Sequence, residues 1–277
     1  MYLEKEAIDF FRRYDLVLPP LARRHGDDPS RILGRNLEFE QYNLYHPGDD
    51  IRDIDWKVYG RTDKLFVKNY GSDITTNVRI LIDNSESMAY HGKVEIAKKI
   101  AAIMAYLLHS RKAGVWVSTV NSEYRDMGRL TLSNLEETLS RIGTSGVTSM
   151  DGIPFIRGRI VFLISDLWVH GLDPAFFTER RINLIHILTP EERELSLHGN
   201  LEMIDMENGK KLQLIPSTIR DLYRTKLRER TDELRAKLSE AFLLYDLFTT
   251  ETPYYTALKR YLDRLSAVTS RGKRWRF

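Results

Sequence analysis

Strand-like and helix-like patterns alternate along the chain from residue 77 onward. Short apolar runs typical of buried strands are "VRILID" at 78–83, "VWVSTV" at 115–120, "RIVFLIS" at 159–165 and "INLIHIL" at 182–188. Between the first two runs, the segment from Lys93 to Arg111 carries apolar residues at helical spacing. This alternation predicts an α/β fold, with a doubly wound, mostly parallel sheet and helices on both of its faces.

Turn and cap residues mark the limits of further elements. The strand at 115–120 is followed by a polar turn and a second strand-like run at 124–130. Ser133 and Glu136 have the spacing of a capping box, which predicts a helix that ends near Gly143. Thr189-Pro190 indicates a helix start, with proline at the first helical position.

The pattern changes after His198. Two apolar-polar runs flank Asn208-Gly209, and this predicts an inserted β-hairpin at about 200–215. A long helix at about 217–240, a strand in "FLLYDLF" and a last helix at about 257–268 complete the expected α/β domain.

The region before residue 77 has a different character. Residues from about Leu3 to Arg24 are expected to be helical, with a break at Pro19-Pro20, and a strand is expected at 65–70, with turn-forming residues between them. We therefore expect residues 1–76 to form an N-terminal helix and a β-containing extension, residues 77–270 the α/β domain, and residues 271–277 a basic tail. The extension should pack on the α/β domain, because its apolar residues are unfavourable in water: Phe39, Tyr45, Ile54, Trp56 and Phe66.

Composition narrows the classes of function. The net charge of +3 comes from 42 basic and 39 acidic residues, a balance that does not indicate nucleic acid as a partner. With no cysteine, the chain has no disulfides, thiolate metal sites or cysteine nucleophiles. Glu4, Lys5 and Glu6 stand where a signal peptide needs an apolar core, and the longest apolar run, at 100–108, is shorter than a membrane span. A cytoplasmic protein without stable membrane insertion is expected.

One stretch carries candidate chemistry. In "ILIDNSESM" an apolar strand leads directly into Asp83, Ser85 and Ser87, which fit either a polar turn or three oxygen ligands of one cation. Asp166 follows the strand at 159–165, and Thr148 lies in the loop before it. Ligands of open parallel sheets bind beyond the carboxyl ends of the strands, so these five residues are expected to meet. Oxygen ligands without imidazole or thiol suit Mg²⁺, and Mn²⁺ or Ca²⁺ would also fit.

The order of these residues resembles a known motif. Asp83-x-Ser85-x-Ser87, a later loop threonine and a strand-end aspartate are similar to the metal-ion-dependent adhesion site of von Willebrand factor A domains. This resemblance implies that Ser85 and Ser87 ligate the metal directly. It also implies that Thr148 does so in one of its states, and that Asp83 and Asp166 act directly or through water.

The upstream segment resembles a narrower family. "YHPGDDIRDIDWKVYGRTDKLFVK" at 45–68, with "DNSESM" and "LISDL", is similar to the hallmark of the bacterial and archaeal family called domain of unknown function fifty-eight. Its members join this segment to an A-type domain and commonly accompany MoxR-type AAA+ ATPases. The resemblance implies a role in the maturation or assembly of protein complexes.

Two classes of function follow. The first is a metal-dependent protein interaction module, not an enzyme, that acts as an adaptor for a MoxR-type AAA+ ATPase and leaves one metal position for a partner's carboxylate. The second is a metal-dependent hydrolase, in which the ion activates water and Glu86 is the adjacent candidate base.

Other polar features have simpler interpretations. The aspartates of the upstream segment form either a second cation site or, as we favour, a structural turn: Asp49, Asp50, Asp53 and Asp55. Trp56 is expected in a core, and His186, within a strand, as a buried residue with its hydrogen bonds satisfied. The tail "RGKRWRF" fits nucleic acid or an anionic membrane, but a solvated tail is favoured.

Overall fold

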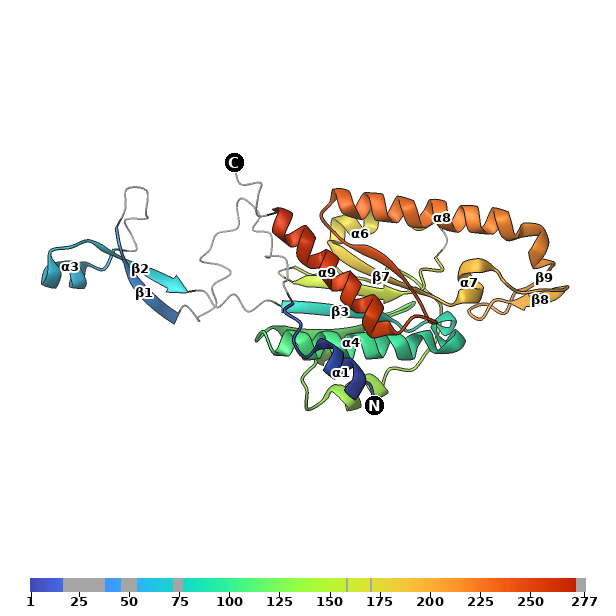
Figure 1. The fold of residues 1–277 in the computed structure, drawn as a ribbon, viewed down its shortest axis with the longest axis horizontal. Helices are drawn as coiled ribbons and strands as arrows, with labels where there is room; N and C mark the ends of the chain where they lie inside the picture. The colour runs from blue at the N-terminus through green and yellow to red at the C-terminus, as the bar shows by residue number, and fades with distance from the viewer. Residues whose placement is uncertain (17–37, 46–53, 72–76, 158, 170, 273–277) are drawn as a thin grey trace. The chain divides into compact units, whose positions relative to one another are not determined.

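The computed structural model describes residues 1–16, 38–45, 54–71, 77–157, 159–169 and 171–272 (Figure 1). The chain forms two compact units. The larger unit consists of Met1–Leu21 with Thr76–Phe277, and the smaller unit of Ala22–Thr75.

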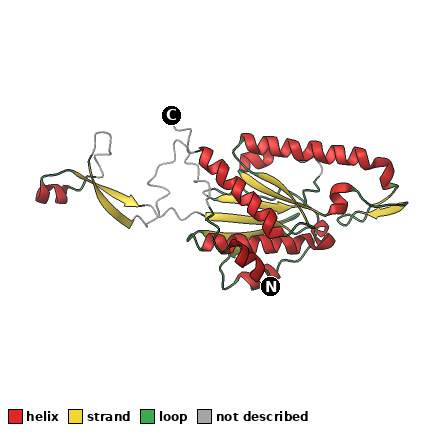
Figure 2. Ribbon diagram, viewed as in Figure 1, coloured by secondary structure: helices red, strands yellow, loops and turns green. Residues whose placement is uncertain are grey.

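A six-stranded sheet is the centre of the larger unit (Figure 2). Its strands are β3 (Asn77–Asp83), β4 (Gly114–Val120), β5 (Tyr124–Arg129), β6 (Ile160–Ser165), β7 (Ile182–Leu188) and β10 (Tyr245–Thr249). They lie in the order β10-β7-β6-β3-β4-β5, and every neighbouring pair is parallel except β4 and β5. The predicted mostly parallel α/β sheet is confirmed, including the strand at 124–130 that turns back on 115–120.

Helices cover both faces of this sheet. One face packs against α1 (Lys5–Phe11), α4 (Lys93–His109), α5 (Leu135–Ser140) and α9 (Tyr254–Gly272). The other face packs against α6 (Ala175–Arg180) and α8 (Pro216–Glu240). Along β3, Ile80 and Ile82 contribute to the first core and Leu81 to the second. Because a strand covered on both faces is mostly apolar, β6 is a continuous hydrophobic run from Ile160 to Ile164 rather than an alternating one. β3 is apolar at Val78 and from Ile80 to Ile82, and its buried Arg79 pairs with Asp126 (2.7 Å).

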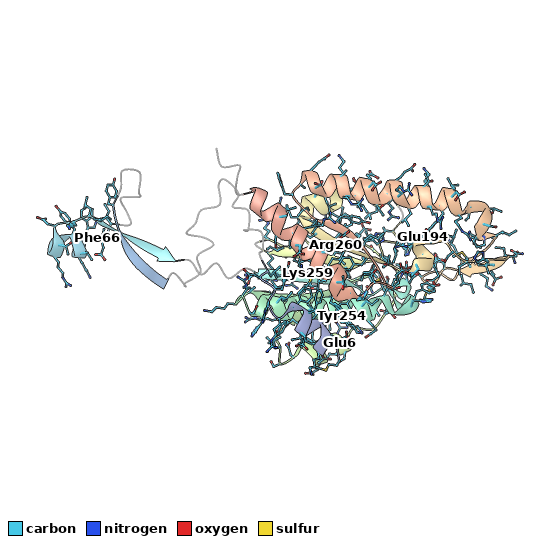
Figure 3. The ribbon with its side chains drawn as sticks, viewed as in Figure 1. Glu6, Phe66, Glu194, Tyr254, Lys259 and Arg260 are labelled. Carbon is cyan, nitrogen blue, oxygen red and sulfur yellow. The ribbon has the colours of Figure 1, made fainter. Side chains whose placement is uncertain are left out.

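Helices α1 and α9 are held to the same face by buried apolar and polar contacts. Phe11 is 1% exposed in the core beneath α4. Tyr254 donates a hydrogen bond from its hydroxyl to Glu4 (2.9 Å), which ties the start of α9 to the start of α1. Figure 3 labels Tyr254 and, on α1, Glu6. Helix α1 ends at Phe11, well before the end expected near Arg24. Residues 17–37 lie outside the described part of the chain.

The short elements of the larger unit lie near the carboxyl ends of the strands. They are the 3₁₀ helix η2 (Glu86–Gly92), the helix α7 (Pro190–Glu194), and the strands β8 (Leu201–Ile204) and β9 (Lys211–Leu214). The last two form an antiparallel pair, which confirms the predicted hairpin. Thr189 caps α7 in a complete capping box with Glu192, so the predicted start of this helix is also confirmed.

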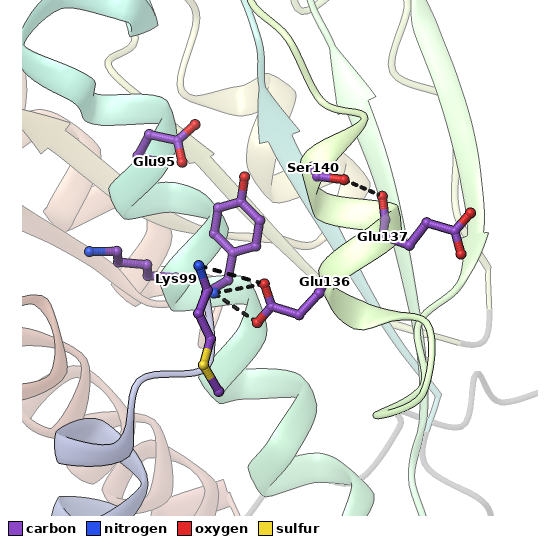
Figure 4. A pocket seen from close by; sticks show the side chains of 7 residues that line it. Glu95, Lys99, Glu136, Glu137 and Ser140 are labelled. Carbon is purple, nitrogen blue, oxygen red and sulfur yellow. Dashed lines mark hydrogen bonds and ion pairs between the residues drawn. The ribbon is translucent and has the colours of Figure 1, made fainter.

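The predicted capping box of Ser133 and Glu136 is wrong. Helix α5 has Asn134 at its N-cap, without a side-chain cap hydrogen bond. The Asn134 side chain instead accepts a hydrogen bond from the Thr131 backbone N–H (2.7 Å). The Glu136 carboxylate accepts one from the Tyr2 backbone N–H (2.8 Å), as Figure 4 shows beside the pocket that these residues line. A distant chain segment thus takes the side chain that the local spacing assigned to the helix start.

The smaller unit contains β1 (Glu38–Leu44), α3 (Trp56–Thr62) and β2 (Phe66–Gly71), with β1 and β2 antiparallel. Asp55 caps α3, because its side chain accepts from the backbone N–H groups of Lys57 (2.9 Å) and Val58 (3.3 Å). This is the structural role expected for Asp55. The other three aspartates, at 49, 50 and 53, lie outside the described residues, as does the tail beyond 272.

Trp56 differs from its expected place in a core. It is 60% exposed and meets Tyr59 edge-on, with ring centroids 6.1 Å apart. As the first residue after the cap, its side chain lies on the outside of a helix that has no buried residue. The packing of the extension on the α/β domain stays a prediction.

Candidate functional site

Two buried aspartates stand at the carboxyl ends of adjacent strands. Asp83 is the last residue of β3 and Asp166 directly follows β6, and they are 0% and 1% exposed. The Asp83 carboxylate accepts hydrogen bonds from the Ser85 backbone N–H (2.9 Å) and from Ser165 Oγ (2.5 Å). Ser165, which the sequence did not single out, therefore fixes the orientation of Asp83 across the two strands.

The three predicted hydroxyl ligands lie together beside these aspartates; we call Ser85, Ser87 and Thr148 the hydroxyl cluster. Ser85 Oγ is 3.1 Å from Ser87 Oγ and 2.9 Å from Thr148 Oγ1. Thr148 Oγ1 is also 2.6 Å from Oε1 of Glu207. Thr148 Oγ1 is placed to donate to Ser85 Oγ and to Glu207 Oε1, and because it carries one proton it can make only one of these hydrogen bonds at a time. The hydroxyl cluster thus lies beside a carboxylate that accepts from Thr148.

Backbone hydrogen bonds bring the loop of Thr148 to the end of β3. Ser145 N–H donates to the Asn84 carbonyl (2.8 Å), and Glu86 N–H donates to the Gly146 carbonyl (3.0 Å). Gly146 has a φ of +72°, a conformation that favours glycine, and this lets the loop turn toward the cluster. Thr148 is thereby 8% exposed and fixed beside Ser85, although the two residues are far apart in sequence.

A lysine that the sequence analysis missed is buried at the same edge. Lys93, the first residue of α4, is 0% exposed, and its ammonium donates to Asp166 Oδ2 (2.7 Å) and Glu192 Oε1 (2.5 Å). Its position had a readable signal. Lys93 shares the core-facing side of α4 with Ala97 and Ile100, where a cation needs a buried partner.

Glu192 reaches Lys93 because the capping box holds it. Its Oε2 accepts from the Thr189 backbone N–H (2.8 Å), and its own N–H donates to Thr189 Oγ1 (3.1 Å). The other oxygen is thus left to face the lysine. One side chain both starts α7 and neutralises a buried charge.

Burial shifts two pKa values near the edge. Burial, with Asp166 close by, raises the pKa of Asp83 to about 7. Burial lowers the pKa of His186 to about 4, so its ring is neutral at physiological pH. His186 Nε2 donates to the Asp166 carbonyl (2.9 Å) and Nδ1 accepts from the Tyr245 hydroxyl (2.9 Å). The expectation of a satisfied core histidine is confirmed.

The hydroxyl cluster offers oxygen atoms, the kind of ligand that Mg²⁺ prefers. Six ligands at about 2.0–2.1 Å from Mg²⁺ form an octahedron, so neighbouring ligand oxygens lie about 3 Å apart. The separations of 2.9 and 3.1 Å in the cluster are those of hydrogen bonds between hydroxyls, and they are also compatible with this ligand spacing. No group of three or more His, Cys, Asp or Glu able to hold a metal occurs among the residues that the structure describes, so a site here would rest on hydroxyls. Ser85, Ser87 and Thr148 would hold the ion, with Asp83 and Asp166 behind them.

Comparison with known proteins identifies the family. A family model described as "Protein of unknown function DUF58" matches residues 41–234, a range that includes the candidate site. The chain belongs to the DUF58 family. Among similar curated proteins, "Uncharacterized protein Mb1516" of Mycobacterium bovis is 25% identical, over 76% of this chain and 74% of its own length. "Uncharacterized protein Rv1480" of Mycobacterium tuberculosis has the same identity and coverage.

Two solved structures align with part of this DUF58 chain. A conserved hypothetical protein BatB from Bacteroides thetaiotaomicron aligns with a TM-score of 0.43 at 12% identity, covering 69% of this chain and 99% of its own. A von Willebrand factor type A protein from Catenulispora acidiphila aligns with a TM-score of 0.36 at 15% identity, covering 74% and 44%. In the described part of the DUF58 chain, no helix has the length and apolar character to cross a membrane.

Proposed function

We propose that this DUF58 protein is a metal-dependent protein interaction module that serves a MoxR-type AAA+ ATPase as an adaptor in the assembly or maturation of protein complexes. The observation that carries the proposal is the hydroxyl cluster, with its oxygens at 2.9 and 3.1 Å, beside two buried carboxylates at one edge of the sheet. The neutral hydroxyls would contact the ion, and the carboxylates of Asp83 and Asp166 would lie behind them, buried at the ends of the strands.

The ligand types explain why such a site would bind a partner. A bound Mg²⁺ would supply positive charge for a carboxylate from the other protein. Ser85, Ser87 and Thr148 are neutral, so they would leave most of that charge uncompensated. Lys93 already pairs with Asp166, which reduces the negative charge that the protein directs toward the cluster. A partner's Asp or Glu would then complete the shell.

The choice of partner rests on the family. The DUF58 match covers residues 41–234, which include the upstream segment and the candidate site. The ATPase partner is what the resemblance to this family implies. The proposal sets the module in the cytoplasm, where an ATP-driven partner would act, and assigns it no nucleic acid. The hydrolase alternative has less support, because Glu86, its candidate base, is exposed.

Two measurements test the proposal together. Ser87→Ala and Thr148→Ala remove hydroxyls of the cluster, and Ser149→Ala is the matched control, since it removes a hydroxyl from the same loop outside the cluster. We expect calorimetry to show millimolar Mg²⁺ binding in the wild type and the control, and much weaker binding in the two cluster variants. Capture of a purified MoxR-type ATPase should follow the same order and be lost with chelator.

The opposite result is equally clear. If the cluster variants bind Mg²⁺ as the wild type does, the metal assignment is wrong. If the wild type captures the ATPase equally well in chelator, the interaction is independent of metal and the adaptor mechanism given above fails.

A further inference from the structure

The hairpin β8–β9 delivers a carboxylate to the hydroxyl cluster. Glu207 lies in the loop between the two strands, and its Oε1 is 2.6 Å from Thr148 Oγ1. The loop is arranged around Asp205, whose Oδ1 accepts from the backbone N–H groups of Glu207 (2.8 Å) and Asn208 (3.3 Å). Gly209 closes the loop with a φ of +70° and a hydrogen bond from its N–H to the Asp205 carbonyl (2.8 Å). The backbone of Glu207 is therefore fixed, and its side chain reaches Thr148.

Glu207 differs from Glu202, the other glutamate of the hairpin. Glu202 forms an ion pair with Lys211 across the two strands (2.7 Å). No ion pair to Glu207 is found within the described part of the chain, and the buried Lys93 contacts Asp166 and Glu192 instead. The Thr148 hydroxyl, which donates to it, is thus the polar partner of the Glu207 carboxylate.

The hairpin has few other means of staying in place. An isolated two-stranded hairpin is marginally stable in water. Its apolar residues contribute little burial, since Ile204 is 55% and Leu212 is 60% exposed. Because a hydrogen bond to a charged group is stronger than a neutral one, the contact between Glu207 and Thr148 is a substantial tether.

We propose that Glu207 is an internal ligand of the hydroxyl cluster, which occupies the position that a partner's carboxylate would take. The inference rests on the proposed function, because it assigns Glu207 the role there given to a partner residue. A partner carboxylate must then displace the hairpin before it binds. The module is closed by its own carboxylate in the absence of a competitor.

Hydrogen exchange tests the tether without any metal. Glu207→Ala removes the carboxylate, Glu207→Gln keeps its shape, and Glu202→Ala is the control on the same hairpin. In chelator, we expect amides of residues 201–214 to exchange on the order of 10- to 100-fold faster in Glu207→Ala than in the wild type. Glu207→Gln should fall between them, because a neutral acceptor makes a weaker bond. Glu202→Ala should stay close to the wild type, since its ion pair is exposed.

Added Mg²⁺ extends the test to the ion. In the wild type, Mg²⁺ should slow exchange of the hairpin further, because Glu207 would then bind the ion as well. In Glu207→Ala, the hairpin should not respond to Mg²⁺, and calorimetry should show weaker Mg²⁺ binding than in the control. Equal exchange of the hairpin in Glu207→Ala and the wild type, in chelator, would overturn the internal ligand.

The two proposals fail in different ways. If neither the wild type nor the variants bind Mg²⁺ but Glu207→Ala loosens the hairpin, the proposed metal-dependent function fails, while the hydrogen bond of Glu207 to the hydroxyl cluster stands. If Mg²⁺ binds the wild type and Glu207→Ala equally and the hairpin is unchanged, the internal ligand is refuted while the metal site stands.

Discussion

Lys93→Met should be the most destabilising single change at the candidate site. Lys93 is fully buried, and its ammonium neutralises two carboxylates, Asp166 at 2.7 Å and Glu192 at 2.5 Å. Methionine fills a similar volume but leaves the Asp166 carboxylate, itself 1% exposed, without its cation. Removing one partner of a buried ion pair costs about 3–5 kcal/mol, because the charge that remains is neither hydrated nor paired.

The size of the effect makes it easy to measure. For a domain of this size, each kcal/mol lowers the melting temperature by about 2–4 °C, so Lys93→Met should melt roughly 6–20 °C below the wild type. Lys226→Met is the control, since Lys226 is 68% exposed and pairs with an exposed glutamate. That variant should lose less than about 1 kcal/mol.

A double variant separates charge from packing. If the cost arises from the unpaired Asp166, then Lys93→Met with Asp166→Asn should be more stable than Lys93→Met alone, because both charges are then absent. Urea unfolding of the wild type, Lys93→Met, Asp166→Asn and the double variant gives the coupling free energy directly. Loss of less than 1 kcal/mol in Lys93→Met, or no recovery in the double variant, would refute the assignment of Lys93 as the resident cation of this edge.

Two further predictions concern pH and a helix cap. The pKa of Asp83 is raised to about 7 from an ordinary value of 3.8, so the native state keeps a proton that the unfolded chain loses, and Asp83 lowers stability as pH rises from about 4 to 7. The pKa of His186 is lowered to about 4 from 6.5, and this raises stability over nearly the same interval. Asp83→Asn should therefore gain stability relative to the wild type as pH rises from 4 to 7 in urea unfolding; a constant difference would contradict the shift. Asp55→Ala should cost about 1 kcal/mol of local stability in α3, seen as faster amide exchange at 56–62, and unchanged exchange would disprove the cap.

Local pattern determined the secondary structure of the α/β domain. Strands buried on both faces are short runs rich in apolar residues, and helix α4 shows its core side at helical spacing, so both can be recognised without tertiary contacts. The hairpin and the start of α7 were equally readable, since Asn208-Gly209 and Thr189-Pro190 act through their own backbone conformations. Because parallel strands end at one edge, strand order also allowed five site residues to be assigned to one place.

Only the tertiary structure decided which side chains these residues meet. Glu136 had the spacing of a cap but binds the backbone of Tyr2, because an N-terminal segment far away in sequence lies beside it. Helix α3 and the exposure of Trp56 were likewise not evident from the aromatic-rich segment that contains them.

The partners at the site came from equally distant elements. Lys93 and Glu207 reach the predicted residues from a helix start and from an inserted hairpin, and nothing in the local sequence specifies either distance. The physical reason is that a hydrogen bond or ion pair depends on atoms being within about 3 Å, and chain folding alone sets that separation for residues remote in sequence. The sequence by itself determined the secondary-structure elements and pointed to the oxygen-bearing residues at the sheet edge, whereas the fold determined that Lys93 and Glu207 contact these residues.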